Sequence, residues 1–205
     1  MKSISKLILP VGILGSSLLN PCFADDTKGV YLRPSIGYTS ISDVTATYLG
    51  VAAAAEIDSG FSYGLNVGYD FGNDIRTEIG YDNVNSDFSK LAGVAITGDI
   101  DVSTFSASIF KDFSSDSKFT PYVGAGLGTT NIDVGTITVG GTSVAGSNSN
   151  TETLTLTLGT NYELNEDSSL FLEGNYRNLG DVTVSDVKYT DISTLGVNAG
   201  IKFSF

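Results

Sequence analysis

Residues 61–71 of the chain read FSYGLNVGYDF, and they alternate between two kinds of side chain. The odd-numbered positions are all aromatic or aliphatic: Phe61, Tyr63, Leu65, Val67, Tyr69 and Phe71. The even-numbered positions are all small or polar: Ser62, Gly64, Asn66, Gly68 and Asp70. Successive side chains of a β-strand point to opposite faces, so this period of two predicts a strand with one apolar and one polar face.

The same alternation recurs in seven further segments, at residues 30–39, 75–82, 104–113, 121–128, 153–162, 170–179 and 196–205. The eight predicted strands have about 9–11 residues each, the length that a tilted strand needs to cross a bilayer. After the N-terminal segment, no apolar run approaches the ~20 residues of a membrane-spanning helix. The sequence therefore predicts an all-β protein.

The connections between the predicted strands alternate in length. Those at residues 72–74, 114–118 and 163–167 are short. Those at roughly residues 40–59, 85–101, 130–150 and 180–192 are long and rich in Gly, Ser, Thr, Asn and Asp. Short turns at one end and long polar loops at the other are typical of outer-membrane barrels.

A soluble β-sandwich or lipocalin-like barrel would also show alternating strands, but its polar face would meet water and carry many charges. Here the polar face consists mostly of Gly, Ser, Thr and Asn, which suit the crowded interior of a narrow barrel. The aromatic residues favour the membrane as well, because they gather near both ends of the strands, as at two bilayer interfaces. At the long-loop ends these are Tyr38, Phe61, Tyr63, Tyr81, Phe105 and Tyr176, and at the short-turn ends Tyr69, Phe71, Phe113, Tyr162, Phe203 and Phe205. We therefore expect an eight-stranded antiparallel up-and-down transmembrane β-barrel with short periplasmic turns and four long extracellular loops.

Charged residues of both signs lie on the predicted interior face. At mid-strand these are Arg33, Arg76, Glu78, Glu173 and Arg177, with Asp70, Asp82 and Lys202 nearer the strand ends. Unpaired charges inside a narrow lumen would be costly, so we expect neighbouring residues of opposite sign to pair. Glu78 and Glu173 could instead act as catalytic carboxylates, but neutralisation by the three arginines is the better interpretation.

The last predicted strand ends on Phe205, with Phe203 on the same face. An open sheet edge in lipid would leave backbone groups unpaired, so this strand is expected to close against the first one. Alternation ending in phenylalanine resembles the C-terminal signature by which outer-membrane barrels are recognised for assembly.

The N-terminal segment carries Lys2 and Lys6, then an apolar stretch from Leu7 to Leu19, then small residues ending at Ala24. This order predicts a secretory signal peptide over residues 1–24, which leaves a single domain at residues 25–205. A membrane anchor is disfavoured because Pro10, Gly12 and Gly15 break the short apolar run. Lipidation of Cys22 is a weaker alternative, since Asn20 and Pro21 stand where small residues are normally found.

Six stretches of the chain, in this order, resemble the small OmpA-like or opacity-type outer-membrane β-barrel family: VYLRPSIGY (30–38), GLNVGYDFG (64–72), IRTEIGYD (75–82), FTPYVGAGLG (119–128), LGTNYELNEDSSLFLEGNYR (158–177) and GIKFSF (200–205). The resemblance spans the whole predicted mature chain. It implies an eight-stranded barrel with four surface loops, and an interior charge cluster at Arg33, Arg76, Glu78, Glu173 and Arg177. Larger members carry a peptidoglycan-binding domain after the barrel, whereas this sequence stops at Phe205, so cell-wall tethering is not expected.

The composition disfavours several classes of function. The formal charge is −12 at pH 7, which argues against nucleic acid as a partner. Histidine is absent and Cys22 is the one cysteine, so neither a histidine-based catalytic triad nor a usual zinc site is expected, and we expect no enzyme, metal or cofactor. The glycines of PYVGAGLG recur every second residue without a following helix, which disfavours a phosphate-binding loop.

The predicted loops leave two further alternatives open. Their many aspartates could bind Ca²⁺ that bridges to lipopolysaccharide, but no loop has calcium-ligand spacing, so a hydrated acidic surface is favoured. The apolar stretch YLGVAAAAEI (48–57) either extends a hairpin above the membrane or contacts a partner, and the hairpin is favoured.

We expect a monomer in the outer membrane, surrounded by lipid and lipopolysaccharide and assembled by periplasmic chaperones and the barrel assembly machinery. Its expected role is structural, with adhesion or another surface contact through the loops. The alternative is a narrow channel for small solutes or ions. Fold alone does not decide between these two functions.

Overall fold

A computed structural model describes residues 28–42, 44–48, 51–114, 116–184 and 187–205 of the chain. The predicted signal peptide and Cys22 lie outside this part of the chain. Within it, no helix is long and apolar enough to cross a membrane.

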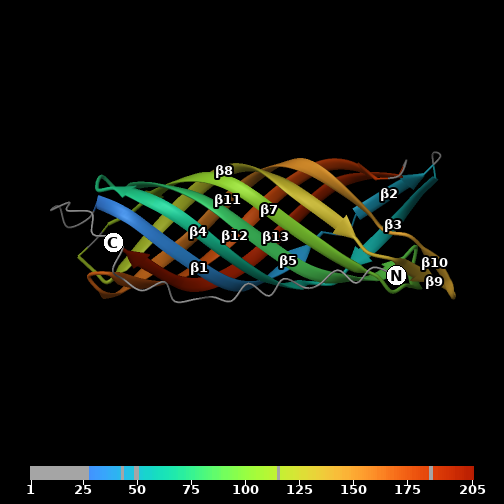
Figure 1. Ribbon diagram of the computed structural model, residues 1–205, viewed down its shortest axis with the longest axis horizontal. Coiled ribbons are helices and arrows are strands. Elements are labelled where there is room, and N and C mark those ends of the chain that lie inside the picture. The colour runs from blue at the N-terminus through green and yellow to red at the C-terminus, as the bar shows by residue number, and fades with distance from the viewer. Residues whose placement is uncertain (1–27, 43, 49–50, 115, 185–186) are drawn as a thin grey trace, which may run out of the picture.

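Eight long antiparallel strands form a closed barrel (Figure 1). Each strand pairs with the next along the chain, and the last pairs with the first, so no long strand is left with an open edge. Three short turns and the C-terminus lie at one end of the barrel, which is the left-hand end in Figure 1. The long strands are β1 (Lys28–Ile41), β4 (Gly60–Phe71), β5 (Ile75–Leu91), β7 (Asp99–Asp112), β8 (Phe119–Val134), β11 (Ser147–Asn165), β12 (Ser168–Val184) and β13 (Val187–Ser204).

Five short strands lie at the opposite end: β2 (Val44–Tyr48), β3 (Val51–Ile57), β6 (Val94–Ala95), β9 (Ile137–Val139) and β10 (Thr142–Val144). The β2–β3 hairpin bridges β13 and β5 beyond the ends of β1 and β4. This confirms that the apolar stretch at residues 48–57 extends a hairpin. β9 and β10 form a separate two-stranded hairpin.

The strands are longer than the sequence pattern predicts. They contain 12 to 19 residues, and much of the expected loop sequence at 85–101, 130–150 and 180–192 belongs to β5, β7, β8, β11, β12 and β13. The predicted bounds of these connections were therefore too wide, because the strands continue beyond the membrane-spanning part. Their polar residues alternate with apolar ones as in the membrane, but the two faces have exchanged character.

Within the membrane-spanning part, the outward side chains are apolar and exposed, as the alternation predicts. Leu127 is 70% exposed and Leu158 66%. A whole surface of such exposed apolar side chains would be unfavourable in water, but it is suited to lipid. The inward side chains there are small, polar or charged. Arg33 and Arg76 are completely enclosed, at 1% and 0% exposure.

Beyond the aromatic side chains at the long-loop ends of the membrane-spanning part, the inward-facing residues become apolar and the outward-facing residues become polar. On β5 the outward series passes from Tyr81 to the exposed polar residues Asn85 and Asp87, while the inward series passes from Asp82 to buried Val84. The phase of the alternation is unchanged, so what differs is the solvent that the outer surface meets. Neighbouring strands behave in the same way, with Asp101, Asn131 and Asp133 outside and Ile100, Val102 and Ile132 inside.

The inward apolar residues of this projecting part pack together inside the barrel. We call this group the apolar cap, and it consists of Ile41, Ala55, Val84, Phe88, Ile96, Ile100, Val102, Ile132, Leu179 and Ile192. Its members come from β1, β3, β5, β7, β8, β12 and β13 and from the β6–β7 connection. Burial of these side chains favours continued strand pairing above the membrane, so the projecting end is a cored β-structure rather than a set of loose loops.

Candidate functional site

The centre of the predicted charge cluster is Arg33 on β1. Its Nη1 atom donates to both carboxylate oxygens of Glu78 on β5, at 2.8 and 3.0 Å. Its Nη2 atom donates to Glu173 Oε2 on β12 at 2.8 Å and to the hydroxyl oxygen of Tyr122 at 3.0 Å. The guanidinium carbon also lies 3.9 Å from the ring centroid of Phe171. One arginine thus links three strands to β1 across the lumen.

Arg76 on β5 forms the second half of the cluster. Its Nε atom donates to both oxygens of Asp112 on β7 at 3.1 Å, and its Nη1 atom donates to Glu78. The guanidinium lies over the ring of Phe110, 4.1 Å from its centroid. Two arginines and three carboxylates therefore lie together in a narrow space, where charges of opposite sign must pair because water is scarce.

Two tyrosine hydroxyls complete the hydrogen bonding of the glutamates. Tyr31 on β1 donates to Glu78 Oε1 at 2.8 Å, and Tyr122 on β8 donates to Glu173 Oε2 at 2.7 Å. Glu78 thus accepts from two arginines and a tyrosine, and Glu173 Oε2 accepts from Arg33 and Tyr122. Such carboxylates neutralise the arginines and are poorly placed to act as an acid–base pair, which supports the structural interpretation over the catalytic one.

Arg177 lies apart from this network. The expectation that it helps to neutralise Glu78 and Glu173 does not hold, because its Nη2 atom pairs with Asp82 Oδ2 at 2.9 Å instead. Arg177 is on β12 two inward positions above Glu173, and this separation along the barrel axis places it in a different layer of the lumen. Nearer the short-turn end, Lys202 and Asp70 lie 3.9 Å apart.

Four glycines of the lumen make room for aromatic rings rather than for an open bore. A Cβ atom at Gly68 would collide with the ring of Tyr31, and one at Gly124 would collide with the ring of Phe110. The same relation holds between Gly159 and Tyr122 and between Gly200 and Phe171. The space beside each of these glycines is therefore filled by an aromatic ring from a neighbouring strand.

Several members of the cluster were not singled out from the sequence. Asp112, Tyr31, Tyr122, Phe110 and Phe171 all stand at inward-facing positions, and the alternation alone could have marked them. Aromatic residues on a face otherwise made of glycine and serine are a usable signal for rings that fill a narrow lumen. The two C-terminal phenylalanines lie as expected, with Phe203 and Phe205 facing outward at the short-turn end.

Among the residues that the structure describes, no group of three or more Asp, Glu, Cys or His side chains is placed to hold a metal ion. The lumen is filled by paired charges and by aromatic rings packed on glycines. The network joins β1, β5, β7, β8 and β12, which stabilises the closed state of the barrel.

Residues 10–205 match the family model described as the outer membrane protein beta-barrel domain. The chain belongs to this family. It is therefore an outer-membrane β-barrel, and the closed antiparallel fold and lipid-facing apolar band agree with that assignment. The family membership also confirms the resemblance to small outer-membrane barrels that the sequence motifs indicated.

Solved barrels of similar architecture come from several bacteria. The chain is similar to the Neisserial surface protein A, with 21% identity and a TM-score of 0.62 over 86% of this chain and 97% of that one. It is similar to OprG of Pseudomonas aeruginosa, with 17% identity and a TM-score of 0.63 over 87% of this chain and 97% of OprG. AlkL in lipid bilayers is 14% identical with a TM-score of 0.52, over 91% and 95% of the two chains. These likenesses show the fold alone, and no curated protein sequence matches the chain.

Proposed function

We propose that this outer-membrane barrel is a filled scaffold whose projecting end makes adhesive or other contacts at the cell surface. The observation that carries the proposal is the exchange of faces above the membrane. Because the projecting strands are cored by the apolar cap, their outward residues are held in a fixed arrangement. A pre-ordered surface loses less conformational entropy on binding than a flexible loop does.

The surface offered for such contact is polar and acidic. On the outer face of β5, β7, β8 and β11 it includes Asp87, Asp99, Asp133 and Glu152, all exposed. Beyond these strands, the β9–β10 hairpin reaches past the end of the barrel (Figure 1). We propose this hairpin as the first segment to test for contact with a surface or host partner.

The adhesion test compares a Gram-negative laboratory strain displaying the protein with the same strain displaying a variant in which residues 136–145 are replaced by a short Gly-Ser linker. This deletion keeps all the members of the apolar cap, although it removes Ile137, which packs against the cap, and the backbone hydrogen bonds between Thr138 and Thr97. We expect the variant to remain folded, as judged by heat-dependent gel mobility, and to adhere less to cultured epithelial cells. Glu166→Gln at a short turn is the control. Adhesion that is unchanged by the deletion contradicts the role of the hairpin.

The alternative function is a narrow channel. The charge cluster, the rings packed on glycines and the apolar cap all argue against it, because each occupies the lumen of an eight-stranded barrel that is only wide enough for side chains. The test is single-channel conductance of the refolded chain in a planar bilayer, alongside Arg76→Ala. We expect no steady openings from the wild-type protein. Steady openings that change in the variant would favour the channel over the filled scaffold.

We also propose that Phe203 and Phe205 serve as the C-terminal assembly signal. Their outward position at the short-turn end leaves both side chains free of the lumen network. Phe205→Ala is expected to slow assembly in cells while the purified chain still refolds in detergent. Equal rates of assembly in cells for the two chains would contradict this role.

A further inference from the structure

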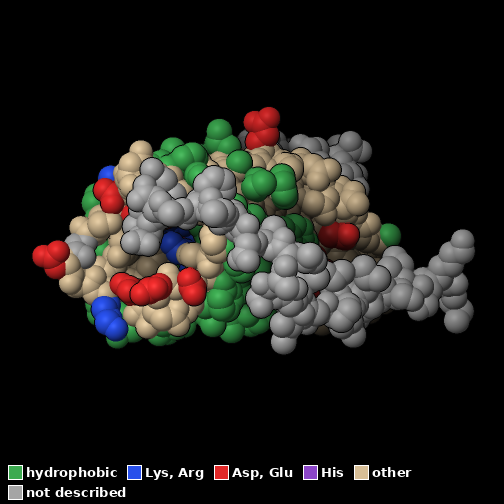
Figure 2. Space-filling view, turned by 60° about the vertical axis from the view of Figure 1, so that its left-hand side comes forward, with side chains coloured by type: hydrophobic (Ala, Val, Ile, Leu, Met, Phe, Trp, Pro, Cys, Tyr) green, Lys and Arg blue, Asp and Glu red, His purple; other side chains and the backbone are tan. Residues whose placement is uncertain are grey.

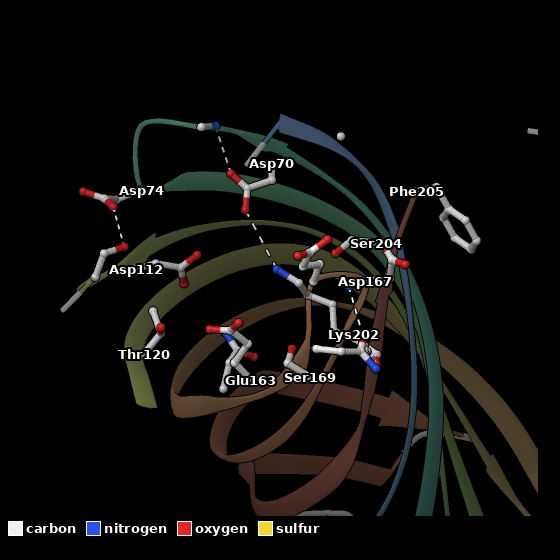
Figure 3. Close-up of a pocket in the computed structure, with 17 residues that line it drawn as sticks. Asp70, Asp74, Asp112, Thr120, Glu163, Asp167, Ser169, Lys202, Ser204 and Phe205 are labelled. Atoms are coloured by element: carbon white, nitrogen blue, oxygen red, sulfur yellow. Dashed lines mark hydrogen bonds and ion pairs between the residues drawn. The ribbon is translucent and has the colours of Figure 1, made fainter. Parts of the chain in front are cut away.

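Polar and apolar side chains are sorted between the inside and the outside of the barrel at its short-turn end. A polar cavity of about 470 Å³ opens there into the lumen. Figure 3 shows Glu163, Ser169 and Lys202 in this cavity, whereas the ring of Phe205 points away from it. In the space-filling view, acidic side chains gather around a hollow at this end of the molecule (Figure 2). The outer surface of the same end carries a different feature, an apolar groove.

This groove lies on the lipid-facing surface and has a volume of about 640 Å³, and we call it the oblique groove. Along one side of it, outward side chains stand in register across the strands: Phe119 with Tyr162, Tyr162 with Leu170, and Leu170 with Ile201. Pro34 on β1 lines the groove beyond Ile201. The rings of Phe119 and Tyr162 pack together with 4.8 Å between their centroids. The oblique groove therefore crosses the surface from β8 to β1.

A short side chain between two taller ones forms the floor of the oblique groove. Ala199 on β13 stands in register between Leu172 on β12 and Ile36 on β1. Leu172 is 55% exposed and Ile36 61%, so both side chains project beyond the alanine. An apolar chain that lies over Ala199 gains contacts on both flanks as well as below, and many such weak contacts add up.

The oblique groove rises through about half of the bilayer. β8 and β1 both begin at the short-turn end, where Phe119 is the first residue of β8, whereas Pro34 is the seventh residue of β1. A strand rises about 3.3 Å per residue and tilts by about 40°, so Pro34 lies about 15 Å above the beginning of β1. This height is about half of a hydrocarbon core of about 30 Å. The groove thus runs from the interface at the short turns toward the mid-plane, which is the extent of one leaflet.

A lysine stands at the lower end of the oblique groove. Lys118 directly precedes Phe119, and its side chain is exposed. Within the described part of the chain, no residue forms an ion pair with Lys118. Two other lysines at this end differ from it, because Lys111 pairs with Asp74 at 2.9 Å and Lys202 lines the polar cavity. An exposed ammonium group beside a lipid-facing groove favours a phosphate as its partner.

We propose that the oblique groove binds one phospholipid of the periplasmic leaflet. One acyl chain lies along the groove over Ala199, and the phosphate accepts hydrogen bonds from the ammonium group of Lys118. The groove is continuous with the apolar band that faces lipid, so the occupant reaches it without leaving the membrane. The site lies away from the projecting end of the barrel, so it does not depend on the adhesive function.

The test is native mass spectrometry of the refolded barrel in detergent with added dioleoylphosphatidylglycerol. We expect the wild-type protein to retain one phospholipid. Lys118→Gln removes the positive charge and is expected to lower the affinity about fivefold, whereas Lys118→Arg should keep it. Ala199→Phe fills the floor of the groove and is expected to lower the affinity by at least about fivefold as well. Heat-dependent gel mobility checks that each variant is folded.

Two matched controls separate this site from the rest of the surface. Ala107→Phe places the same ring at an outward alanine of β7, on the opposite side of the barrel. Lys90→Gln removes a positive charge at the projecting end. Both variants are expected to retain the phospholipid as the wild type does.

Four outcomes would overturn the proposal. The first is the absence of a retained phospholipid on the folded wild-type protein. The second is an equal loss of affinity in the groove variants and in the controls, which would mean that lipid binds around the barrel without preference. The third is equal retention of dioleoylglycerol with no effect of Lys118→Gln, which would mean that the groove takes an apolar chain alone. The fourth is a protein dimer that Ala199→Phe abolishes while no lipid is retained, which would identify a second copy of the chain as the occupant.

Discussion

At the scale of single residues, the lumen shows how buried charge is tolerated in a narrow barrel. Arg33 and Arg76 are fully enclosed, and both Nη atoms of Arg33 and the Nε and Nη1 atoms of Arg76 donate to carboxylates or tyrosine hydroxyls. Arg33 Nε and Arg76 Nη2 have no hydrogen-bond partner among the described residues. Glu78 is the shared partner, because both arginines and Tyr31 donate to it. Loss of a buried partner is more damaging than its net contribution suggests, since the remaining charges stay desolvated.

Glu78→Gln is therefore expected to lower the free energy of unfolding by about 3–5 kcal/mol, because it leaves two buried guanidinium groups with one carboxylate fewer. The measurement is urea unfolding of the barrel in lipid vesicles, followed by circular dichroism. Glu152→Gln makes the same chemical change at an exposed position and should shift the free energy by no more than about 0.5 kcal/mol. Equal effects of the two changes would contradict a central role for Glu78.

Outside the membrane, Asp74 in the β4–β5 turn gives a prediction about pH. Hydrogen bonds from the Ser114 hydroxyl and from the Lys111 ammonium lower the pKa of this carboxyl below its usual value. A lowered pKa means that the ionised form stabilises the folded turn above the usual aspartate range, and that this stabilisation is lost as pH falls through the folded-state pKa.

Asp74→Asn should accordingly be less stable than the wild type at neutral pH, with the difference narrowing as pH falls below about 4. Asparagine tolerates the positive φ of 61° at this position, so the backbone is not the cause. Thermal unfolding across pH 3–7 makes the comparison. A difference that grows on acidification would contradict the sign of the pKa shift.

At the scale of elements, each long strand passes through two environments without a change of phase. On β5, Ile79 faces lipid and Glu78 faces the lumen, whereas higher up Asp87 faces water and Phe88 faces the apolar cap. The pattern of polar and apolar residues is set by what surrounds the barrel at each level. The cap is thus a soluble-type core that continues a membrane barrel.

Phe88→Ala is expected to cost about 3–5 kcal/mol of folding stability, the usual loss for a large side chain removed from a packed core. Phe88→Leu is the control, because it nearly conserves volume and should cost less than about 1.5 kcal/mol. Urea unfolding of both variants tests this. A Phe88→Ala variant as stable as the wild type would mean that the cap is not packed as a core.

The closing pair of strands, β1 and β13, contains one weak point. Pro34 has no N–H group, and the register between the two strands is interrupted at Arg33 and Pro34, between the pairs Leu32 with Phe203 and Ser35 with Gly200. An unpaired backbone group in lipid costs several kcal/mol, whereas proline stabilises through the unfolded chain by only about 0.4–1 kcal/mol. The cost of the unpaired backbone group is therefore larger than the stabilisation that proline provides through the unfolded chain.

Pro34→Ala is therefore expected to stabilise the barrel by restoring a donor at the closure. A rise in the temperature at which the barrel loses its folded gel mobility would show this. A fall in that temperature would mean that the rigid φ of proline matters more than the ladder bond.

At the scale of the whole molecule, the barrel has successive layers along its axis. A polar cavity of about 470 Å³ lies at the short-turn end, the charge cluster and its aromatic rings follow, and the apolar cap fills the projecting end. The charge cluster and the apolar cap close the lumen by different kinds of contact, the first polar and the second apolar. Closure of the sheet leaves the long strands without an unpaired edge in lipid.

Hydrogen exchange distinguishes this layered molecule from a barrel with loose loops. Amides at residues 84–88 and 100–102 are expected to exchange slowly, because they belong to paired strands over the apolar cap. Residues 140–141, at the tip of the β9–β10 hairpin, provide the fast-exchanging comparison. Exchange at residues 84–88 and 100–102 that is as fast as at residues 140–141 would contradict a packed core in the projecting end of the barrel.

The amino-acid sequence by itself determined the strands, their number, their membrane-facing side and the polarity of the lumen, because a period of two is a local property of extended chain. It also marked Arg33, Arg76, Glu78 and Glu173 as lumen residues. Only the tertiary structure decided that Arg177 pairs with Asp82 and that Asp112 completes the cluster, since partners across a barrel depend on register and stagger between distant strands. The same holds for the apolar cap, whose residues lie in segments that look like polar loops until closure of the barrel brings their inward side chains together.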